Sequence, residues 1–482
     1  MNFDQYRFEQ NPFINEVEAY EKNLEVLQKA FLAGSEVDPG SMVGSESGRP
    51  ESLEAQFISL THEEEDCKLW QLLVKEKVKS PVIQYARRLD LAQAVTYSEG
   101  GDVDNLPDRF DRQWDYVKFI GVKGEVSGVA KETEFIVDAM TEETQNKIKS
   151  LIRGIDLLCW HGDSTIIDTE FDSFYNQVMR KAKAPQIQVL DKRGYRLSYN
   201  DLIDSNTILT KNYARRSGRK LITAVEALDG LVKDEIANRT YFTNADKQSI
   251  NMKRVLEEGF STGTGMGTIH YDLFASPKTP LFTVGGAPIV NQEITAFVSN
   301  HPKAPNAPAT LTPSVIASTT DYEMEAGTYN YAVTAINRFG ESVAVETTVV
   351  VSGGGKMVQF GAFSESGTPV AGQEALGFRL YRRKGSETEF SDYKLVKTVG
   401  LDDTKHYDDN EDIPGTTYAI LADWDPKQVV RIAQQMPLYR LPYGVRKDAF
   451  EFLIKVYLTL QVKNANKIRI IKNIGDIPNV YA

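Results

Sequence analysis

The chain has 482 residues, of which 41% are hydrophobic and 25% are charged, and its formal net charge is −12. This length predicts two or more domains, and the composition is typical of a folded, soluble protein. The net negative charge disfavours general binding to nucleic acid, and no apolar run approaches the roughly 20 residues that span a bilayer. The first thirty residues are too acidic for a signal peptide, and the two cysteines fit no disulfide or metal motif, so we expect a cytoplasm-like compartment.

The two ends of the chain differ in charge. Residues 1–66 hold 15 acidic and 4 basic residues, whereas residues 426–482 hold 3 acidic and 10 basic residues. Such ends could attract each other within one subunit or between neighbouring subunits. Two solvated faces of unrelated domains would give the same pattern, and charge alone favours that interpretation.

An amphipathic helix is predicted over residues 13–33, because apolar residues recur there at three- and four-residue steps. Its stripe includes Leu24, Leu27 and Phe31, which need a surface on which to pack. Residues 34–50 are rich in Gly, Ser, Glu and Pro and offer no such surface. A helical pattern resumes over residues 53–78, so we expect residues 1–78 to form an N-terminal arm that packs on a distant surface or on another copy.

Two β-like segments flank a polar, turn-rich stretch and predict an extended hairpin over residues 79–130. A lone hairpin is marginally stable in water, so we expect it to lie on a neighbouring subunit. The alternative is a hairpin folded back on its own domain. Charges of both signs interleave along it and are the candidate inter-subunit contacts, namely Arg87, Arg88, Asp90, Asp108, Arg109, Asp111 and Arg112.

The clearest helical pattern of the chain covers residues 141–160, with two acidic residues in its first turn. Its apolar stripe is expected to be a buried core, formed by Ile148, Ile152, Ile155 and Leu158. This helix belongs to a segment over residues 131–170. Short strands and helices then alternate over residues 171–301, which predicts a mixed α/β domain.

The pattern changes at a proline-rich linker that begins at His301. Short segments rich in β-branched and aromatic residues, separated by Gly, Asp and Ser, predict an antiparallel sandwich over residues 302–422. The stretch at residues 327–342 looks like the middle strands of immunoglobulin-like or fibronectin-like modules. Helix-like and buried-strand patterns return over residues 423–482, so the sandwich is predicted to be an insertion. The expected fold class is therefore α+β with an inserted all-β domain.

No candidate catalytic group emerges from the sequence. The glycine-rich loop at residues 259–267 lacks the Lys-Ser/Thr pair of a phosphate-binding loop, and no helical pattern follows it. His161, Asp163 and Ser164 are too close in sequence to converge as a triad. An acidic cluster contains three weak candidates for a metal site, Asp408, Asp409 and Asp412, but a solvated turn explains it more simply. We predict no enzyme activity and no cofactor.

Several segments, in order, resemble the major capsid proteins of tailed bacteriophages, which have the Hong Kong 97-type fold, and especially those of large contractile-tailed phages. The likeness lies in the run at residues 59–90, in "WHGDS" followed by "FDSFYNQV", and in the closing stretch at residues 430–473. The resemblance implies an N-terminal arm at residues 1–78, an E-loop at 79–130 and a P-domain spine helix at 131–170. It further implies an A-domain at residues 171–301, to which residues 423–482 return together with P-domain strands.

The resemblance also implies a function. Copies of the chain would assemble as hexamers and pentamers into an icosahedral shell around double-stranded DNA, without sequence-specific binding. Further partners would be portal, scaffold or decoration proteins, and no membrane would be involved. The protein would assemble in the host cytoplasm and reside in the virion capsid. The sandwich would lie on the outer surface of the shell. The alternative is a phage adhesin or tail-associated protein that binds a surface ligand through the sandwich. Within the shell interpretation, a vertex-specific paralogue and a cargo-holding encapsulin stay open.

Overall fold

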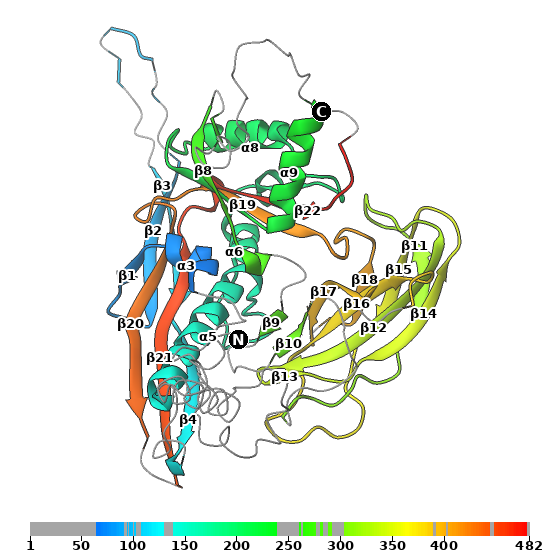
Figure 1. Cartoon of the computed structure of the whole chain (residues 1–482). Coiled ribbons are helices and arrows are strands. Elements are labelled where there is room, and N and C mark those ends of the chain that lie inside the picture. Colours follow the sequence, from blue (N-terminus) through cyan, green and yellow to red (C-terminus); the bar gives the residue numbers. More distant parts are fainter. Residues whose placement is uncertain are drawn as a thin grey trace, which may run out of the picture. The chain divides into compact units, whose positions relative to one another are not determined.

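A computed structural model describes residues 64–90, 94, 96–99, 101–102, 108–129, 138–238, 260–261, 264–275, 280–282, 288–291, 303–388, 392–401, 403–443 and 448–479. These residues fold into a body of helices and sheets and an all-β sandwich, as Figure 1 shows. The predicted α+β fold class is confirmed. None of the helices in these ranges is long and apolar enough to cross a bilayer.

A four-stranded sheet with the order β1-β20-β21-β4 forms one part of the body. Its strands are β1 (Lys75–Lys77), β20 (Val430–Pro442), β21 (Ala449–Val462) and β4 (Lys118–Ser127). Alternate side chains of β21 are buried in one core with the long helix α5 (Ala139–His161), and they are Phe452, Ile454, Val456 and Leu458. The predicted strand character of the closing segment follows from this alternation.

The start of the body differs from the helix predicted over residues 53–78. Its described part holds a 3₁₀ turn η3 (Glu64–Asp66) and a short helix α3 (Lys68–Leu72), and the chain then becomes extended in β1. β1 pairs in parallel with β20, from Lys75 opposite Ile432 to Lys77 opposite Gln434. The prediction is therefore wrong beyond Leu72, because backbone hydrogen bonding to β20 overrides the helical propensity of these Lys and Glu residues.

A six-stranded mixed sheet with the order β5-β22-β19-β6-β8-β7 forms the second part of the body. Its strands are β5 (Val189–Asp191), β22 (Ile468–Ile474), β19 (Thr417–Asp423), β6 (Arg219–Thr223), β8 (Met266–Tyr271) and β7 (Phe260–Ser261). Two helices, α8 (Tyr199–Lys211) and α9 (Val225–Asn238), bury Leu202, Leu209 and Leu231 in a core shared with this sheet. The short helices α6 (Phe174–Lys181) and α7 (Pro185–Gln188) follow α5 in the chain.

The predicted sandwich boundary at residue 422 is wrong. β19 pairs with β6 and β22 of the six-stranded sheet, and the last strand of the sandwich ends at Asp408. β19 is apolar on both faces, as a central strand of a covered sheet should be. An apolar run of this kind identifies a buried strand but not the sheet to which it belongs.

The sandwich consists of two antiparallel sheets around one core. The first sheet has the order β11-β15-β18, and the second has the order β13-β12-β16-β17 with β14 also on β12. Their bounds are β11 (Pro313–Ala317), β12 (Gly327–Asn337), β13 (Gly340–Glu341), β14 (Val345–Val351), β15 (Lys356–Gly361), β16 (Gly377–Lys384), β17 (Lys394–Gly400) and β18 (Lys405–Asp408). Tyr331, Val333, Phe360, Phe378 and Leu380 fill the space between the sheets. A separate pair, β9 (Pro280–Phe282) and β10 (Pro288–Asn291), precedes the sandwich.

Candidate assembly surfaces

The hairpin strands β2 (Val82–Asp90) and β3 (Arg109–Tyr116) form a two-stranded sheet with two different faces. Side chains alternate between the faces of a strand, and burial follows that alternation here. The inner face, buried or half-buried, consists of Ile83, Tyr85, Arg87, Asp111, Gln113 and Asp115. The outer face, exposed at every position, consists of Val82, Gln84, Ala86, Arg88, Phe110, Arg112, Trp114 and Tyr116.

The inner face is attached to α6 and β21 by hydrogen bonds and an ion pair. The Tyr85 hydroxyl donates to the carbonyl oxygen of Val462 at 2.9 Å, and Arg87 Nη1 donates to the carbonyl oxygen of Lys181 at 2.9 Å. Lys181 Nζ lies 2.6 Å from Asp115 Oδ1, and both side chains are 11% exposed. Burial lowers the pKa of Lys181, and the Asp115 carboxylate opposes this effect. The root of the hairpin is therefore fixed on its own subunit.

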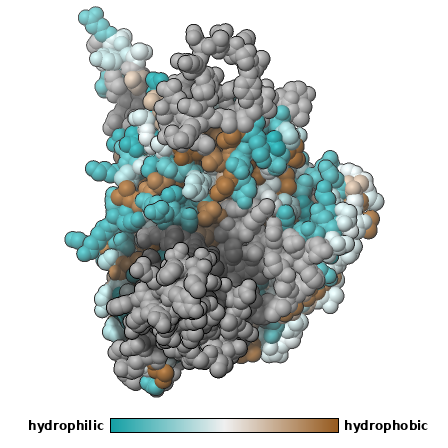
Figure 2. All heavy atoms as spheres, in the orientation of Figure 1, coloured by the Kyte–Doolittle hydropathy of each residue, from teal (hydrophilic) through white to brown (hydrophobic). Residues whose placement is uncertain are grey.

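The outer face carries three large aromatic side chains in the open. Phe110 is 62% exposed, and Trp114 and Tyr116 are each 56% exposed. The guanidinium carbon of Arg88 lies 5.5 Å from the ring centre of Phe110, which is within reach of a cation–π contact. Around the hairpin strands, Figure 2 shows hydrophobic side chains at the surface among hydrophilic ones. Trp, Tyr and Arg at this density are typical of the energetic centre of protein interfaces.

The predicted inter-subunit contacts divide between the two faces. Arg88, Arg109 and Arg112 are exposed, and Arg88 Nε lies 3.8 Å from Asp108 Oδ2. Arg87 Nη2 instead pairs with Asp111 Oδ2 at 2.6 Å on the inner face, and this hydrogen bond holds the pKa of Asp111 below its ordinary value. Asp90 lies opposite Arg109 in the strand register, and its side chain lies outside the described part of the structure.

Sequence reasoning had missed the aromatic side chains of the outer face and the Lys181–Asp115 anchor. The alternation in "RFDRQWDY" was a signal for the former, because each aromatic ring there is two or four residues from the next. The partner of Asp115 could not be read from the sequence, since Lys181 lies in a different element.

The remaining predicted positions are distributed as follows. Ile152, Ile155 and Leu158 of α5 are at most 4% exposed, and Ile148 is partly buried against the same core. Leu24, Leu27 and Phe31 lie outside the described residues.

The acidic cluster of the sandwich is committed to protein contacts. Asp408 is 1% exposed, accepts a hydrogen bond from the Tyr331 hydroxyl at 2.7 Å, and forms a two-pronged ion pair with Arg382. Asp409 accepts a hydrogen bond from the Thr320 hydroxyl at 2.8 Å, and Asp412 lies 3.6 Å from Lys472 Nζ. Within the described ranges, no three His, Cys, Asp or Glu side chains gather as a group that could hold a metal ion.

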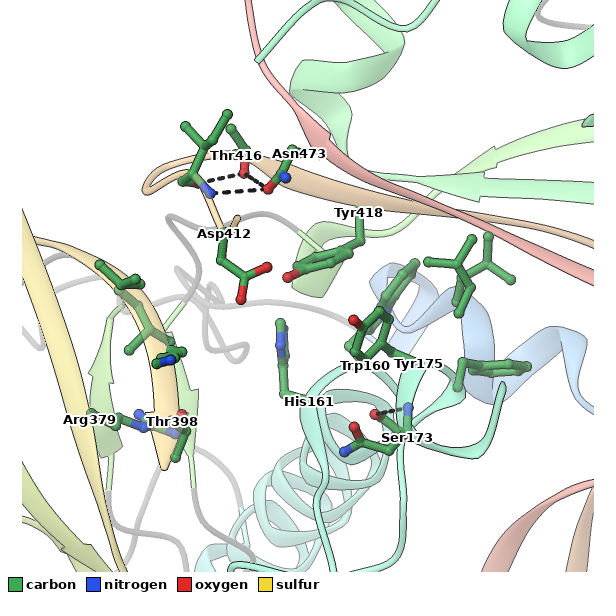
Figure 3. Close-up of a pocket in the computed structure, with 18 residues that line it drawn as sticks. Trp160, His161, Ser173, Tyr175, Arg379, Thr398, Asp412, Thr416, Tyr418 and Asn473 are labelled. Carbon is green, nitrogen blue, oxygen red and sulfur yellow. Dashed lines mark hydrogen bonds between the residues drawn. The ribbon is translucent and has the colours of Figure 1, made fainter. Parts of the chain in front are cut away.

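A polar cavity of about 210 Å³ separates the sandwich from the end of α5. Figure 3 shows His161 and Asp412 at this cavity, with Arg379 and Thr398 on the sandwich side. Burial lowers the pKa of His161 to about 4, so its ring is neutral at physiological pH. The Ser173 hydroxyl accepts a hydrogen bond from the backbone N–H of Asn176, so it caps α6.

The residues of "WHGDS" do not meet as a triad. His161 Nε2 lies 3.4 Å from the carbonyl oxygen of Phe274, and Asp163 accepts hydrogen bonds from Thr165. The backbone N–H of Ser164 donates to Asp172 instead. A nucleophile and its base need to lie within hydrogen-bonding reach, and no hydrogen bond joins these three side chains.

Comparison with known proteins finds sequence similarity to capsid proteins over most of the chain. No protein-family model matches the chain. The major capsid protein of Staphylococcus phage K is 20% identical to it over 470 residues, which cover 92% of this chain and 94% of that protein. The chain is related to phage major capsid proteins. The major capsid protein of Staphylococcus phage S25-3 aligns with the same identity and coverage. The predicted resemblance to tailed-phage major capsid proteins is confirmed.

Solved structures also align with this chain over most of its length. The capsid of the native GTA particle is 9% identical, with a TM-score of 0.45, and covers 92% of this chain and 98% of that chain. The capsid of Myoviridae phage XM1 is 9% identical, with a TM-score of 0.44, and covers 90% of this chain and 99% of that chain. The SrpI encapsulin from Synechococcus elongatus PCC 7942 is 8% identical, with a TM-score of 0.41, and covers 91% and 97% of the two chains.

Proposed function

We propose that this chain is the structural subunit of an icosahedral phage capsid and assembles from many copies of itself. The proposal is carried by its relation to phage major capsid proteins along nearly their full length. An alignment over 92% of the chain leaves fewer residues outside it than the sandwich contains, so it does not stop at the inserted domain. The proposed role is structural and involves no catalysis.

The two-faced hairpin supports self-assembly. Its inner face is held by the subunit itself, whereas its outer face presents three aromatic rings to solvent. If a second copy covered about 300 Å² of these rings, the transfer free energy would be roughly 7 kcal/mol before the entropic costs of association. A second copy of this chain is therefore the proposed occupant of the outer face, with the exposed Arg88, Arg109 and Arg112 at its border.

The finer parts of the proposal concern arrangement and partners. We infer that hexamers and pentamers enclose double-stranded DNA, and the net charge of −12 favours enclosure without tight binding to the phosphate backbone. Portal, scaffold or decoration proteins would contact the shell, which would assemble in the host cytoplasm. We keep the proposed boundaries of the N-terminal arm, residues 1–78, and of the E-loop, residues 79–130. The sandwich is proposed to lie on the outer surface of the shell.

The adhesin alternative is not supported. The relatives along the full chain are capsid proteins, and the acidic sandwich side chains that could have met a ligand bind Arg382, Thr320 and Lys472 of the same chain. Removal of residues 303–412 would distinguish the two hypotheses. A shell subunit should still assemble without these residues, whereas an adhesin should lose its binding function.

The test replaces two outer-face aromatics and follows particle formation. Full-length protein carrying Phe110→Ser and Trp114→Ser is compared with the unaltered chain and with Tyr213→Ser, a matched control because Tyr213 is 88% exposed and follows helix α8 instead of belonging to a hairpin strand. Negative-stain microscopy and sedimentation should show shells for the unaltered chain and the control, and folded monomers for the double variant. Equal assembly of all three proteins would refute the role of the outer face, and a purely monomeric unaltered chain would refute the capsid function.

A further inference from the structure

Two buried aspartates meet where the first described segment lies on α5. Asp156 of α5 and Asp272, which precedes the 3₁₀ turn η4 (Leu273–Ala275), are both 0% exposed. The backbone N–H of Trp70 donates to Asp156 Oδ1 at 2.8 Å, and that of Leu69 donates to Asp272 Oδ2 at 3.2 Å. Both N–H groups belong to the first turn of α3, where no helical carbonyl is available to them. The two carboxyl groups thus hold α3 from two separate elements.

The hydrogen bonds also locate a proton. Both oxygens of Asp272 accept backbone N–H groups, since Oδ1 receives Phe274 N at 2.9 Å and Oδ2 receives Leu69 N. Asp156 Oδ2 is buried and no N–H group reaches it. Two carboxylates in contact cannot both keep their charge in a dry interior, so one must carry a proton. The oxygen that no N–H group reaches, Asp156 Oδ2, is the one available to carry it.

The surroundings maintain this state. Burial and the neighbouring Asp272 raise the pKa of Asp156 well above its ordinary value, while burial raises that of Asp272 against the effect of its backbone N–H donors. The other titratable groups nearby are Asp66, Cys67, Lys75, Arg153 and Cys159. Burial, with the charges of the two aspartates, raises the pKa of both thiols, so these stay neutral. The positive charge of Arg153 acts on Cys67, and that of Lys75 acts on Cys159.

We propose that Asp156 and Asp272 form a proton-dependent latch that fixes residues 67–73 to α5 and releases them when rising pH removes the proton. With the proton present, one O–H group links the carboxyl groups and both backbone N–H groups of α3 keep an acceptor. Without it, two negative charges adjoin in a core that contains Leu69, Leu73 and Ile155. Opening α3 to water then relieves the repulsion. The proposal rests on the fold alone and is independent of the capsid function.

The direction of the pH effect follows from the raised pKa. The folded state holds the proton of Asp156 more tightly than the unfolded chain does. The latch therefore contributes its full stability at acid pH and loses it as the pH rises through the raised pKa. Between the ordinary pKa of an aspartate and that raised pKa, each pH unit should raise the open population about tenfold, and above the raised pKa the open population should level off.

The two cysteines of the chain give a direct readout of opening. Cys67 immediately precedes α3 and Cys159 lies in α5, and both are 0% exposed. Full-length Cys159→Ala protein reports on Cys67 alone, and full-length Cys67→Ala protein reports on Cys159 alone. Labelling rates with a disulfide reagent such as DTNB are measured from pH 6 to pH 10, each divided by the rate of the same protein in denaturant to remove the effect of thiolate fraction.

The corrected rate of Cys67 should rise about tenfold per pH unit up to the raised pKa of the pair and then level off, whereas that of Cys159 should stay flat. In Asp156→Asn protein the Cys67 rate should also stay flat, because the amide oxygen still accepts from Trp70 and the amide NH₂ donates to Asp272 without a titratable proton. A flat Cys67 profile would overturn the proposal, as would an equal rise at both cysteines or an unchanged rise in Asp156→Asn.

A second measurement needs no substitution. Hydrogen exchange of the peptide that covers residues 67–73, corrected for the intrinsic base-catalysed rate, should accelerate over the same pH range as Cys67 labelling. Exchange that follows the intrinsic rate alone would overturn the latch even if Asp156→Asn failed to fold.

Discussion

Replacement of Lys181 by Met tests whether the hairpin is anchored as described. Lys181 Nζ binds Asp115 Oδ1 at 2.6 Å, Gln177 Oε1 at 3.0 Å and the carbonyl oxygen of Val462 at 3.2 Å. Met keeps most of the length of the side chain but cannot donate a hydrogen bond. The Asp115 carboxylate then retains Gln461 Nε2, at 3.2 Å, as its side-chain donor. Loss of one partner of a buried pair costs about 3–5 kcal/mol, and the retained Gln461 bond places this variant at about 3 kcal/mol.

Urea unfolding of the full chain, followed by tryptophan fluorescence, measures the loss for Lys181→Met. The matched control is Arg88→Met, because the Arg88–Asp108 pair spans 3.8 Å and its side chains are 56% and 32% exposed. An exposed pair of this kind contributes about 0–1 kcal/mol, so the control should unfold almost as the unaltered chain does. Adding Asp115→Asn to Lys181→Met should restore part of the stability, since it removes the unpaired charge. Equal midpoints for Lys181→Met and Arg88→Met would refute the buried anchor.

Three further predictions concern the sandwich and its contact with the body. Arg382→Met should destabilise the sandwich by about 3 kcal/mol in chemical unfolding, because it leaves the buried carboxylate of Asp408 without its cationic partner. A loss below about 1 kcal/mol would mean that water reaches this pair. Gly377→Ala should lower the thermal midpoint, because a Cβ there would lie 2.6 Å from Ile166 Cγ2 and 2.7 Å from the Val399 carbonyl oxygen; an unchanged midpoint would show that the sandwich does not approach Ile166 so closely. Burial raises the pKa of Glu170 from 4.5 to about 7, so stability should fall as the pH rises between these values, and Glu170→Gln should flatten that dependence; the same slope in both proteins would assign it to another group.

Helix α5 and strand β21 were predictable as elements because their apolar residues recur at a simple period in the sequence. β21 buries every second residue from Phe452 to Leu458, so the pattern also identifies its inner face there. α5 is instead buried on nearly every side over its last three turns, which its stripe did not indicate. β19 shows the limit of this approach. Its residues are apolar on both faces, and a strand of that kind could belong to either sheet.

The candidate surfaces were less predictable, because they depend on which distant segments meet. The hairpin was recognisable in the sequence, but the sequence did not distinguish Arg87 and Asp111 from Arg88 and Arg112. The structure shows that the first two form an ion pair on the inner face and that the other two are exposed. Asp156 and Asp272 carry no sequence signal at all, since each is a lone carboxylate in an otherwise apolar segment. Only the packing of α5 against η4 brings the two side chains together.

The turn between β14 and β15 is a suitable site for the insertion of a foreign peptide. Residues 352–355 are exposed, and Gly353 and Gly355 have φ values of +91° and +71°, a left-handed backbone conformation that glycine adopts without steric cost. The Gly355 N–H binds Glu323 at 2.6 Å, so the bond between Gly353 and Gly354 is the better point of entry. A peptide inserted there leaves both sheets intact. Each subunit would then present one copy, and a shell would repeat it at regular spacing.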